Sequence, residues 1–190
     1  MKKTLLAAAL TTLLAAPAAS ANDYVIDTEG AHAFIQFKIN HLGYSWLLGR
    51  FNDFEGSFSY DESNPEAASV EVTIDTASID SNHGERDTHL RSGDFLDVEK
   101  FPQSTFVSTG FEPDGNGGGV LHGEFTLRGV TKEIKFEVDQ VGAGEDPWGN
   151  TRRGFEGSYT FALADYGIDY ELGPDAEEVE IYLSIEGIQQ

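Results

Sequence analysis

Apolar and polar residues alternate along most of this 190-residue chain, and this alternation limits its fold more than any other feature. Successive side chains of a β-strand point to opposite faces, so the pattern indicates strands with one apolar and one polar face. In 70–76, for example, Val70, Val72 and Ile74 share a face. Strands are predicted over 31–39, 54–60, 70–76, 104–109, 119–127, 133–138, 155–163 and 179–185, with a short opening strand over 24–26 as an option.

The number and type of these strands indicate the fold class. Clusters of Gly, Asn, Asp and Pro separate them, as at 113–119 and 142–150, and one apolar face per strand is typical of an antiparallel sheet. Eight such strands form an up-and-down barrel or a sandwich. Because neither an internal repeat nor an interdomain linker is visible, the chain is predicted to hold one all-β domain over 22–190.

Two segments depart from the alternation. In Asn40–Arg50 the apolar residues do not recur at period 2, so this stretch is expected to be a connection rather than a strand. In Asp80–Ser92, Asn82 followed by Glu85 resembles a capping box, which predicts a short helical segment near residues 83–92.

The first 21 residues have the features of a secretory signal peptide. Lys2 and Lys3 precede an apolar stretch over 5–16, and Ala19-Ser20-Ala21 forms a small-residue cleavage site, so the mature chain is expected to begin at Asn22. The apolar stretch is too short to span a bilayer, and no longer apolar run follows it. The prediction is a secreted protein of the periplasm without stable membrane insertion.

The chain is strongly acidic and has no cysteine. Twelve Lys and Arg stand against 33 Asp and Glu, a net charge of −21. Such a chain repels phosphates, which argues against nucleic acid and anionic membranes as partners. The lack of Cys excludes disulfides, thiol catalysis and Cys-type zinc sites. Acids such as Glu55, Glu71 and Glu137 fall on the outer faces, so the charge is interpreted as a solubilising coat around an apolar interior.

The inner faces of the predicted strands are almost entirely apolar, which is compatible with a solid core or with a lumen. A solid core is the more common outcome for an all-β domain, but Ala33, Gly56, Gly123 and Gly157 alternate with large residues and favour a lumen. An eight-stranded barrel is wide enough to hold one small ligand. An apolar lumen would hold a water-insoluble molecule, and the 42–48 stretch would cap one mouth.

Polar and charged residues crowd 83–91 and leave several interpretations open. On a helix His83, Arg86 and Asp87 share one face, while His89 points elsewhere. This face could form an acid–base site, an ion-pair network that ties the loop to the barrel, or a polar contact for a ligand headgroup. His83 and His89 are spaced poorly for a metal, and no nucleophile-elbow motif is present, so neither a metal nor a catalytic residue is assigned.

Four separated motifs resemble one protein family. They are HAFIQFKINHLGYSWLLGRFNDFEGSF (32–58), SNHGERDTHLRSGDFLDVEKFP (81–102), TLRGVTKEI (126–134) and DPWGN…RRGFEG (146–157). Together they are similar to the YceI-like family of bacterial periplasmic, lipocalin-like polyisoprenoid-binding proteins. The resemblance implies an extended eight-stranded antiparallel barrel whose apolar lumen holds a polyprenyl chain, such as that of an isoprenoid quinone.

The resemblance also implies which residues contact the lipid. The lumen would be lined by Ile35, Phe37, Ile39, Phe58, Val72, Ile74, Phe106, Phe125, Phe136, Tyr159, Phe161 and Leu183. A headgroup or mouth site would use Trp46, His83, Arg86 and Asp87.

The resulting hypothesis is a non-enzymatic periplasmic protein that transports or stores an isoprenoid lipid, with no other cofactor. The first alternative is an enzyme acting on a lipid or small ester through His83, Arg86 and Asp87. The second is a simply packed barrel. The oligomeric state stays open, with a homodimer as one option.

Overall fold

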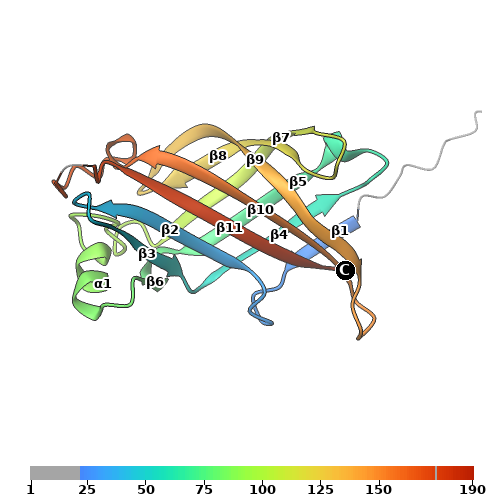
Figure 1. Ribbon diagram of the computed structural model, residues 1–190, viewed down its shortest axis with the longest axis horizontal. Coiled ribbons are helices and arrows are strands. Elements are labelled where there is room, and N and C mark those ends of the chain that lie inside the picture. The colour runs from blue at the N-terminus through green and yellow to red at the C-terminus, as the bar shows by residue number, and fades with distance from the viewer. Residues whose placement is uncertain (1–21, 174) are drawn as a thin grey trace, which may run out of the picture.

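The alternating segments form β-strands that close into a barrel (Figure 1). The computed structural model describes residues 22–173 and 175–190, so the signal peptide predicted over 1–21 lies outside the described residues. The strands are β1 (Asn22–Ile26), β2 (Phe34–His41), β3 (Ser45–Phe51), β4 (Phe54–Tyr60), β5 (Ser69–Asp75), β6 (Ile79–Asp80), β7 (Gln103–Pro113), β8 (Gly119–Leu127), β9 (Val130–Glu145), β10 (Thr151–Ala162) and β11 (Glu178–Gln189). The described helices are α1 (Gly84–Arg91) and short 3-10 turns at Pro65–Ala67, Thr76–Ser78 and Leu163–Tyr166.

Three pairs of these segments, β1 with β2, β4 with β3 and β5 with β6, each take the place of one interrupted strand. The barrel therefore has eight strands. β1 and β2 both pair antiparallel with β11, at different heights along it. β3 and β4 pair in the same way with β2 and β1, and β6 and β5 pair in turn with β3 and β4. From β5 the ladder continues through β7, β8, β9 and β10 to β11, where the ring closes. The predicted eight-stranded antiparallel barrel is therefore confirmed.

The prediction for Asn40–Arg50 is wrong, because β3 occupies most of it. β2 and β3 form a hairpin that pairs from Ile35 opposite Phe51 to His41 opposite Ser45. Leu42 and Gly43 both have positive φ, as the tight turn of a twisted hairpin requires. Trp46 and Leu48 point outward although they are apolar, and this hides the alternation in the sequence.

The short helix predicted near 83–92 is confirmed as α1, but its cap differs from the predicted one. His83 is the N-cap residue, and its Nδ1 accepts a hydrogen bond from the Arg86 backbone N–H at 3.2 Å. Asn82 lies outside the helix with a left-handed backbone. The helix lies at one end of the barrel, near the tip of the β2–β3 hairpin and the connection from β10 to β11 (Figure 1).

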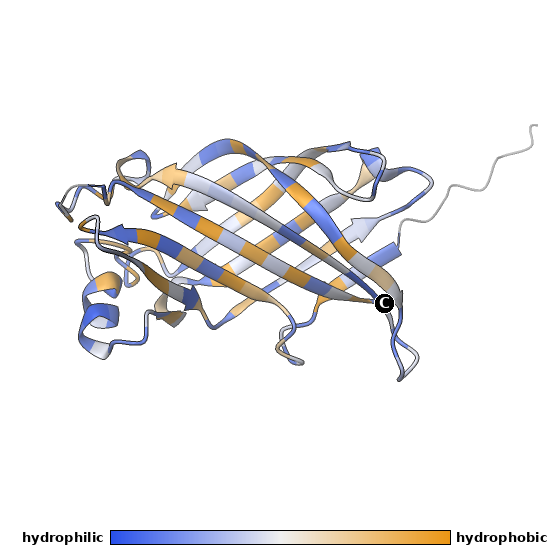
Figure 2. Cartoon of the chain, in the orientation of Figure 1, coloured by the Kyte–Doolittle hydropathy of each residue, from blue (hydrophilic) through white to orange (hydrophobic). Residues whose placement is uncertain are grey.

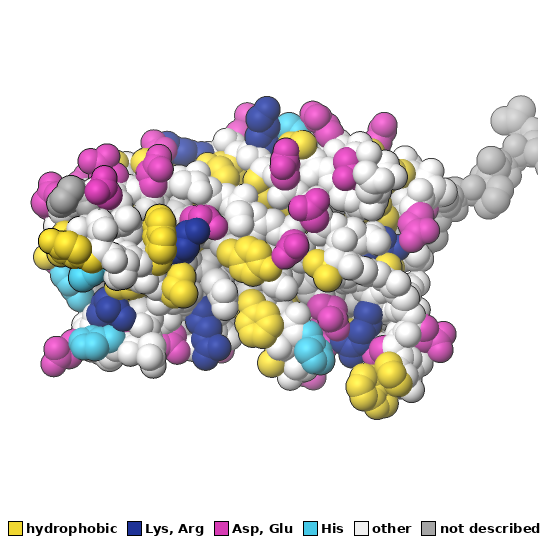
Figure 3. Space-filling model, in the orientation of Figure 1, with side chains coloured by type: hydrophobic (Ala, Val, Ile, Leu, Met, Phe, Trp, Pro, Cys, Tyr) yellow, Lys and Arg dark blue, Asp and Glu magenta, His cyan; other side chains and the backbone are white. Residues whose placement is uncertain are grey.

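The core is divided between the two ends of the barrel. Figure 2 shows the alternation of apolar and polar residues along the strands. At the α1 end, buried residues such as Phe37, Phe95 and Phe161 form the larger cluster. At the opposite end Tyr24 stacks on Phe58 with ring centroids 4.7 Å apart, within a second cluster. On the outside, acidic side chains are scattered over the visible face (Figure 3), and Glu55, Glu71 and Glu137 are exposed as predicted.

Candidate ligand cavity

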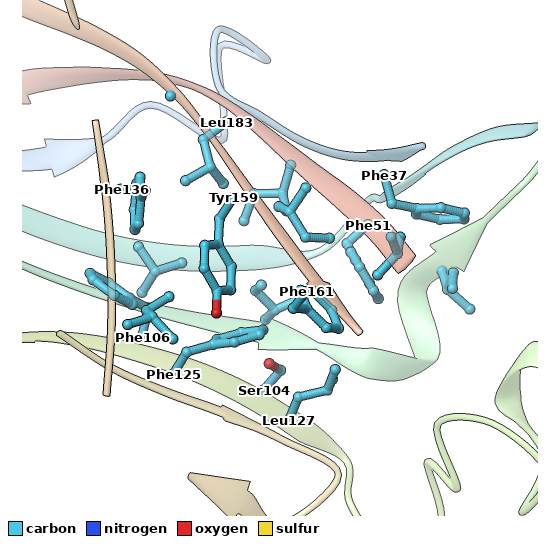
Figure 4. Close-up of a pocket in the computed structure, with 18 of the residues that line it drawn as sticks. Phe37, Phe51, Ser104, Phe106, Phe125, Leu127, Phe136, Tyr159, Phe161 and Leu183 are labelled. Atoms are coloured by element: carbon cyan, nitrogen blue, oxygen red, sulfur yellow. The ribbon is translucent and has the colours of Figure 1, made fainter. Parts of the chain in front are cut away.

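The barrel encloses a cavity of about 480 Å³, a size typical of small-molecule sites. All twelve side chains that the family resemblance placed in a lumen lie in its wall. Phe106, Phe125, Phe136, Tyr159 and Leu183 project into the space between the strands (Figure 4). The interior is therefore a lumen rather than a solid core.

Aromatic rings form much of the middle of this wall. The centroids of Phe106 and Phe136 are 5.7 Å apart, and those of Phe125 and Phe161 are 5.8 Å apart, in edge-on arrangements. Ser104 also lines the cavity, but its hydroxyl donates to the Thr126 carbonyl at 2.7 Å. Because this hydroxyl is already bonded, the middle of the lumen offers mainly apolar contact to a ligand.

Of the four small inward residues that the sequence singled out, only Gly157 lies in the cavity wall. At Gly123 the ring of Phe106 lies directly over the backbone, where a Cβ atom would overlap it. At Gly56 the space is taken by Ile26 and Val72. Gly56 and Gly123 leave room for these neighbouring side chains. They affect the cavity only through where those side chains lie.

The cavity reaches solvent at the α1 end. Its wall there includes the exposed His41 and Tyr170 and the half-buried Arg86 and His89. The sequence expected His89 to point away from the site, but its ring packs edge-on against Phe95 and Tyr170, both 5.0 Å away between centroids. This contact could not be foreseen from helix spacing, because Tyr170 comes from the distant connection between β10 and β11.

A second hollow of about 300 Å³ lies beside this mouth. It is lined by His41, Ser45, Trp46, Leu47, Leu48 and Arg86. His41, Leu47 and Arg86 belong to both walls, so the two spaces adjoin. Trp46 thus lies outside the lumen on the outer face of β3, where Lys38 Nζ sits 4.9 Å from its ring centroid.

Arg86 is held in a fixed position by Ser81. Its Nε donates to Ser81 Oγ at 2.7 Å, and its Nη2 donates to the Ser81 carbonyl at 2.5 Å. Asp87 is buried and accepts hydrogen bonds from the backbone N–H and hydroxyl of the same serine. Burial raises the pKa of Asp87, but the bonds from Ser81 outweigh it and keep this pKa below its ordinary value. Ser81, which the sequence reasoning did not single out, therefore couples Asp87 to Arg86.

The structure does not assemble His83, Arg86 and Asp87 into an acid–base site. His83 is exposed, caps the helix and does not line the cavity. Asp87 faces Ser81 and is also absent from the cavity wall. Of the three, only Arg86 borders the space where a ligand would lie.

The sequence reasoning also missed a buried cation at the opposite end. Arg153 lies two residues before Phe155 on β10 and therefore points to the same inner face. Only 5% of the surface of Arg153 is exposed. Its guanidinium lies 4.4 Å from the ring centroid of Tyr60 and donates to Gln140 at 2.5 Å and to Glu62 at 2.6 Å. Tyr60 and Phe155 line the cavity and Arg153 does not. Arg153 therefore supports that end of the cavity through its contact with Tyr60.

One group of side chains in the described chain has the donor atoms of a metal site. Asp27, His32 and Glu186 bring their ligand atoms within 4.8 Å of one another. Arg152 donates from Nη1 to both carboxylates, so a guanidinium cation already occupies this position. In 22–173 and 175–190 no helix is long and apolar enough to cross a bilayer.

These features define a class of protein: an up-and-down antiparallel barrel around an apolar cavity, with polar groups at one mouth. A YceI-like domain matches residues 24–187, and the chain belongs to the YceI-like family. A UPF0312 protein of Shewanella sp. (strain MR-7) is 58% identical over 191 residues, which cover 100% of both chains.

Two solved structures share the fold. BcnA of Burkholderia cenocepacia superimposes with a TM-score of 0.76 at 21% identity, covering 85% of this chain and 98% of BcnA. A polyisoprenoid binding domain from Saccharophagus degradans, implicated in plant cell wall breakdown, superimposes with a TM-score of 0.64 at 13% identity. It covers 88% of this chain and 98% of that domain.

Proposed function

We propose that this protein holds a polyisoprenoid lipid, an isoprenoid quinone or another polyprenyl chain, in its lumen and transports or stores it in the periplasm. The observation that carries the proposal is the apolar, aromatic-lined cavity that extends from Phe58 and Phe155 to the mouth at His89. Each Å² of ligand surface buried there contributes about 25 cal/mol. A long hydrocarbon chain fits such a lumen better than a compact polar metabolite.

Three further observations support this function. The chain belongs to the YceI-like family, and a barrel of the same fold from Saccharophagus degradans is described as a polyisoprenoid binding domain. The signal peptide predicted over 1–21 supports the periplasm as the compartment. His83 caps α1 and Asp87 binds Ser81, so neither borders the cavity beside Arg86, which favours binding over catalysis.

The test is the identity of the molecule that purifies with the protein. The full chain is expressed in a bacterium, isolated from the periplasmic fraction, extracted with organic solvent and analysed by mass spectrometry. We expect one isoprenoid lipid in near-stoichiometric amount, and re-uptake of added quinone or prenol by the extracted protein. The proposal would be overturned if the protein purified from the periplasmic fraction contained no lipid and also failed to bind added prenol and quinone.

Neighbouring positions on β2 provide a matched pair of variants. Phe37→Glu places a carboxylate in the lumen wall, where an unpaired charge is costly, and should abolish lipid uptake. Gln36→Glu adds the same charge on the exposed face and should leave uptake unchanged. If Phe37→Glu does not fold, Leu183→Trp fills the lumen without a charge and should lower the bound amount.

A further inference from the structure

Arg86 is the one Lys or Arg in the described part of the chain that borders the lumen. Other cations of this acidic protein, such as Lys38 and Lys132, are paired with carboxylates. Arg86 has no carboxylate within 4.0 Å among residues 22–173 and 175–190. A guanidinium carries five N–H donors, and its Nη1 makes no hydrogen bond with the described residues.

The surroundings of Arg86 suit an amphiphile rather than a pure hydrocarbon. On one side lies the apolar lumen, and on the other lies the hollow lined by His41, Ser45 and Trp46. Ser81 fixes the guanidinium at the boundary between the two spaces. Because Asp87 holds Ser81 from the buried side, the free edge of Arg86 is already oriented before a ligand arrives.

We infer that the ligand carries an anionic oxygen headgroup, of the phosphate or carboxylate type, which Arg86 binds in the hollow beside the mouth. The inference rests on the proposed lipid-binding function and, within it, selects a polyprenyl phosphate or carboxylate over a neutral quinone. The prenyl chain lies in the lumen, and the head lies against Arg86, His41 and Trp46. Arginine is suited to this role because its planar donor fork matches the oxygens of phosphate and carboxylate.

The test compares two probes with the same chain, geranylgeraniol and geranylgeranyl phosphate, on protein from which lipid has been extracted. Competition with a fluorescent apolar probe gives the Kd of each. We expect the phosphate to bind about tenfold more tightly than the alcohol, the size of a hydrogen bond to a charged group. In Arg86→Gln this ratio should fall to about one while the Kd of the alcohol stays the same.

Arg50→Gln is the matched control, since Arg50 is an exposed cation near the far end of β3 that borders neither space. It should keep the wild-type ratio. A ratio near one in the wild type, or an unchanged ratio in Arg86→Gln, would overturn the inference and leave the lipid-binding function standing. If neither probe binds the wild type, the proposed function itself fails.

A fluorescence measurement locates the head without any change at Arg86. The chain has two tryptophans, Trp46 and Trp148, so Trp148→Phe leaves Trp46 as the single reporter in the hollow. The phosphate probe should shift the Trp46 emission, and the alcohol should shift it much less. Equal shifts, or no shift with the phosphate at saturation, contradict the assigned headgroup position.

Discussion

Arg152 on β10 donates a hydrogen bond from Nη1 to Asp27 Oδ2, 2.7 Å away at the end of β1. The same nitrogen reaches Glu186 on β11 at 2.6 Å, and Nε reaches Asp146 in the β9–β10 turn at 2.6 Å. Asp27 lies where the chain leaves β1 for the loop to β2. The cluster therefore ties the interruption of the first strand to the two strands that close the barrel.

Asp27→Asn should make the protein less stable at neutral pH and remove part of its acid sensitivity. The hydrogen bond from Arg152, and then that of His32, lowers the pKa of Asp27 to about 2. Since the unfolded value is about 3.9, the carboxylate stabilises the fold above about pH 4, and its contribution of roughly 1–2 kcal/mol is lost as the pH falls through 2. Urea unfolding at pH 7 and at low pH should show a difference between wild type and variant that shrinks on acidification.

Asp23→Asn is the control for this experiment. Asp23 is exposed on β1, so its substitution removes the same charge without affecting a contact of Arg152. Its effect should be small at every pH. An Asp27→Asn variant whose deficit is the same at both pH values would contradict the assigned role of Asp27.

Gly123→Ala should disturb the lumen through its neighbour Phe106. A Cβ atom at 123 would overlap the Phe106 ring and the Val107 carbonyl. Such overpacking costs roughly 1–3 kcal/mol, so we expect a lower Tm and a reduced lipid capacity as the ring is pushed inward. Gly110→Ala, on the paired strand β7, meets open space and should leave both quantities unchanged. Equal behaviour of the two variants would refute the close approach at Gly123.

The helix cap gives a prediction that separates the sequence interpretation from the structure. His83→Ala removes the acceptor of the Arg86 N–H, and loss of an N-cap costs about 1 kcal/mol. Glu85→Ala would be equally costly if a capping box with Asn82 existed, but no such contact occurs among the described residues, so we expect little change. Thermal unfolding of the two variants decides between them.

Period-2 alternation predicted the strands and their apolar inner faces because both depend on one physical rule, whereas the closed barrel and its lipid-holding lumen were implied by the family resemblance. A strand with an apolar inner face must bury that face, and closing the sheet places every inward residue around one axis. Phe37, Phe136 and Tyr159 could therefore be assigned to the interior from their positions alone, and all three line the cavity.

The same rule fails where tertiary contacts override the pattern. β3 was not recognised because Trp46 and Leu48 are apolar on its outer face. The direction of His89 depends on Tyr170, which is distant in sequence, and the role of Ser81 depends on how the chain enters α1. Arg153 could have been found from the sequence, because it falls on the inner face of β10 together with Phe155. A buried charge on that face requires polar partners.

The affinity for prenols should rise with chain length and then level off when the lumen is full. Each buried methylene contributes about 0.8 kcal/mol, so every added isoprene unit strengthens binding until it extends beyond the mouth at His89. Titration with geraniol, farnesol, geranylgeraniol and longer prenols should give a Kd that falls steeply and then reaches a plateau. Leu183→Trp, which narrows the lumen (Figure 4), should move that plateau to shorter chains, whereas Tyr182→Trp, on the opposite face of β11, should not. An affinity independent of chain length would show that the prenyl chain does not occupy the lumen.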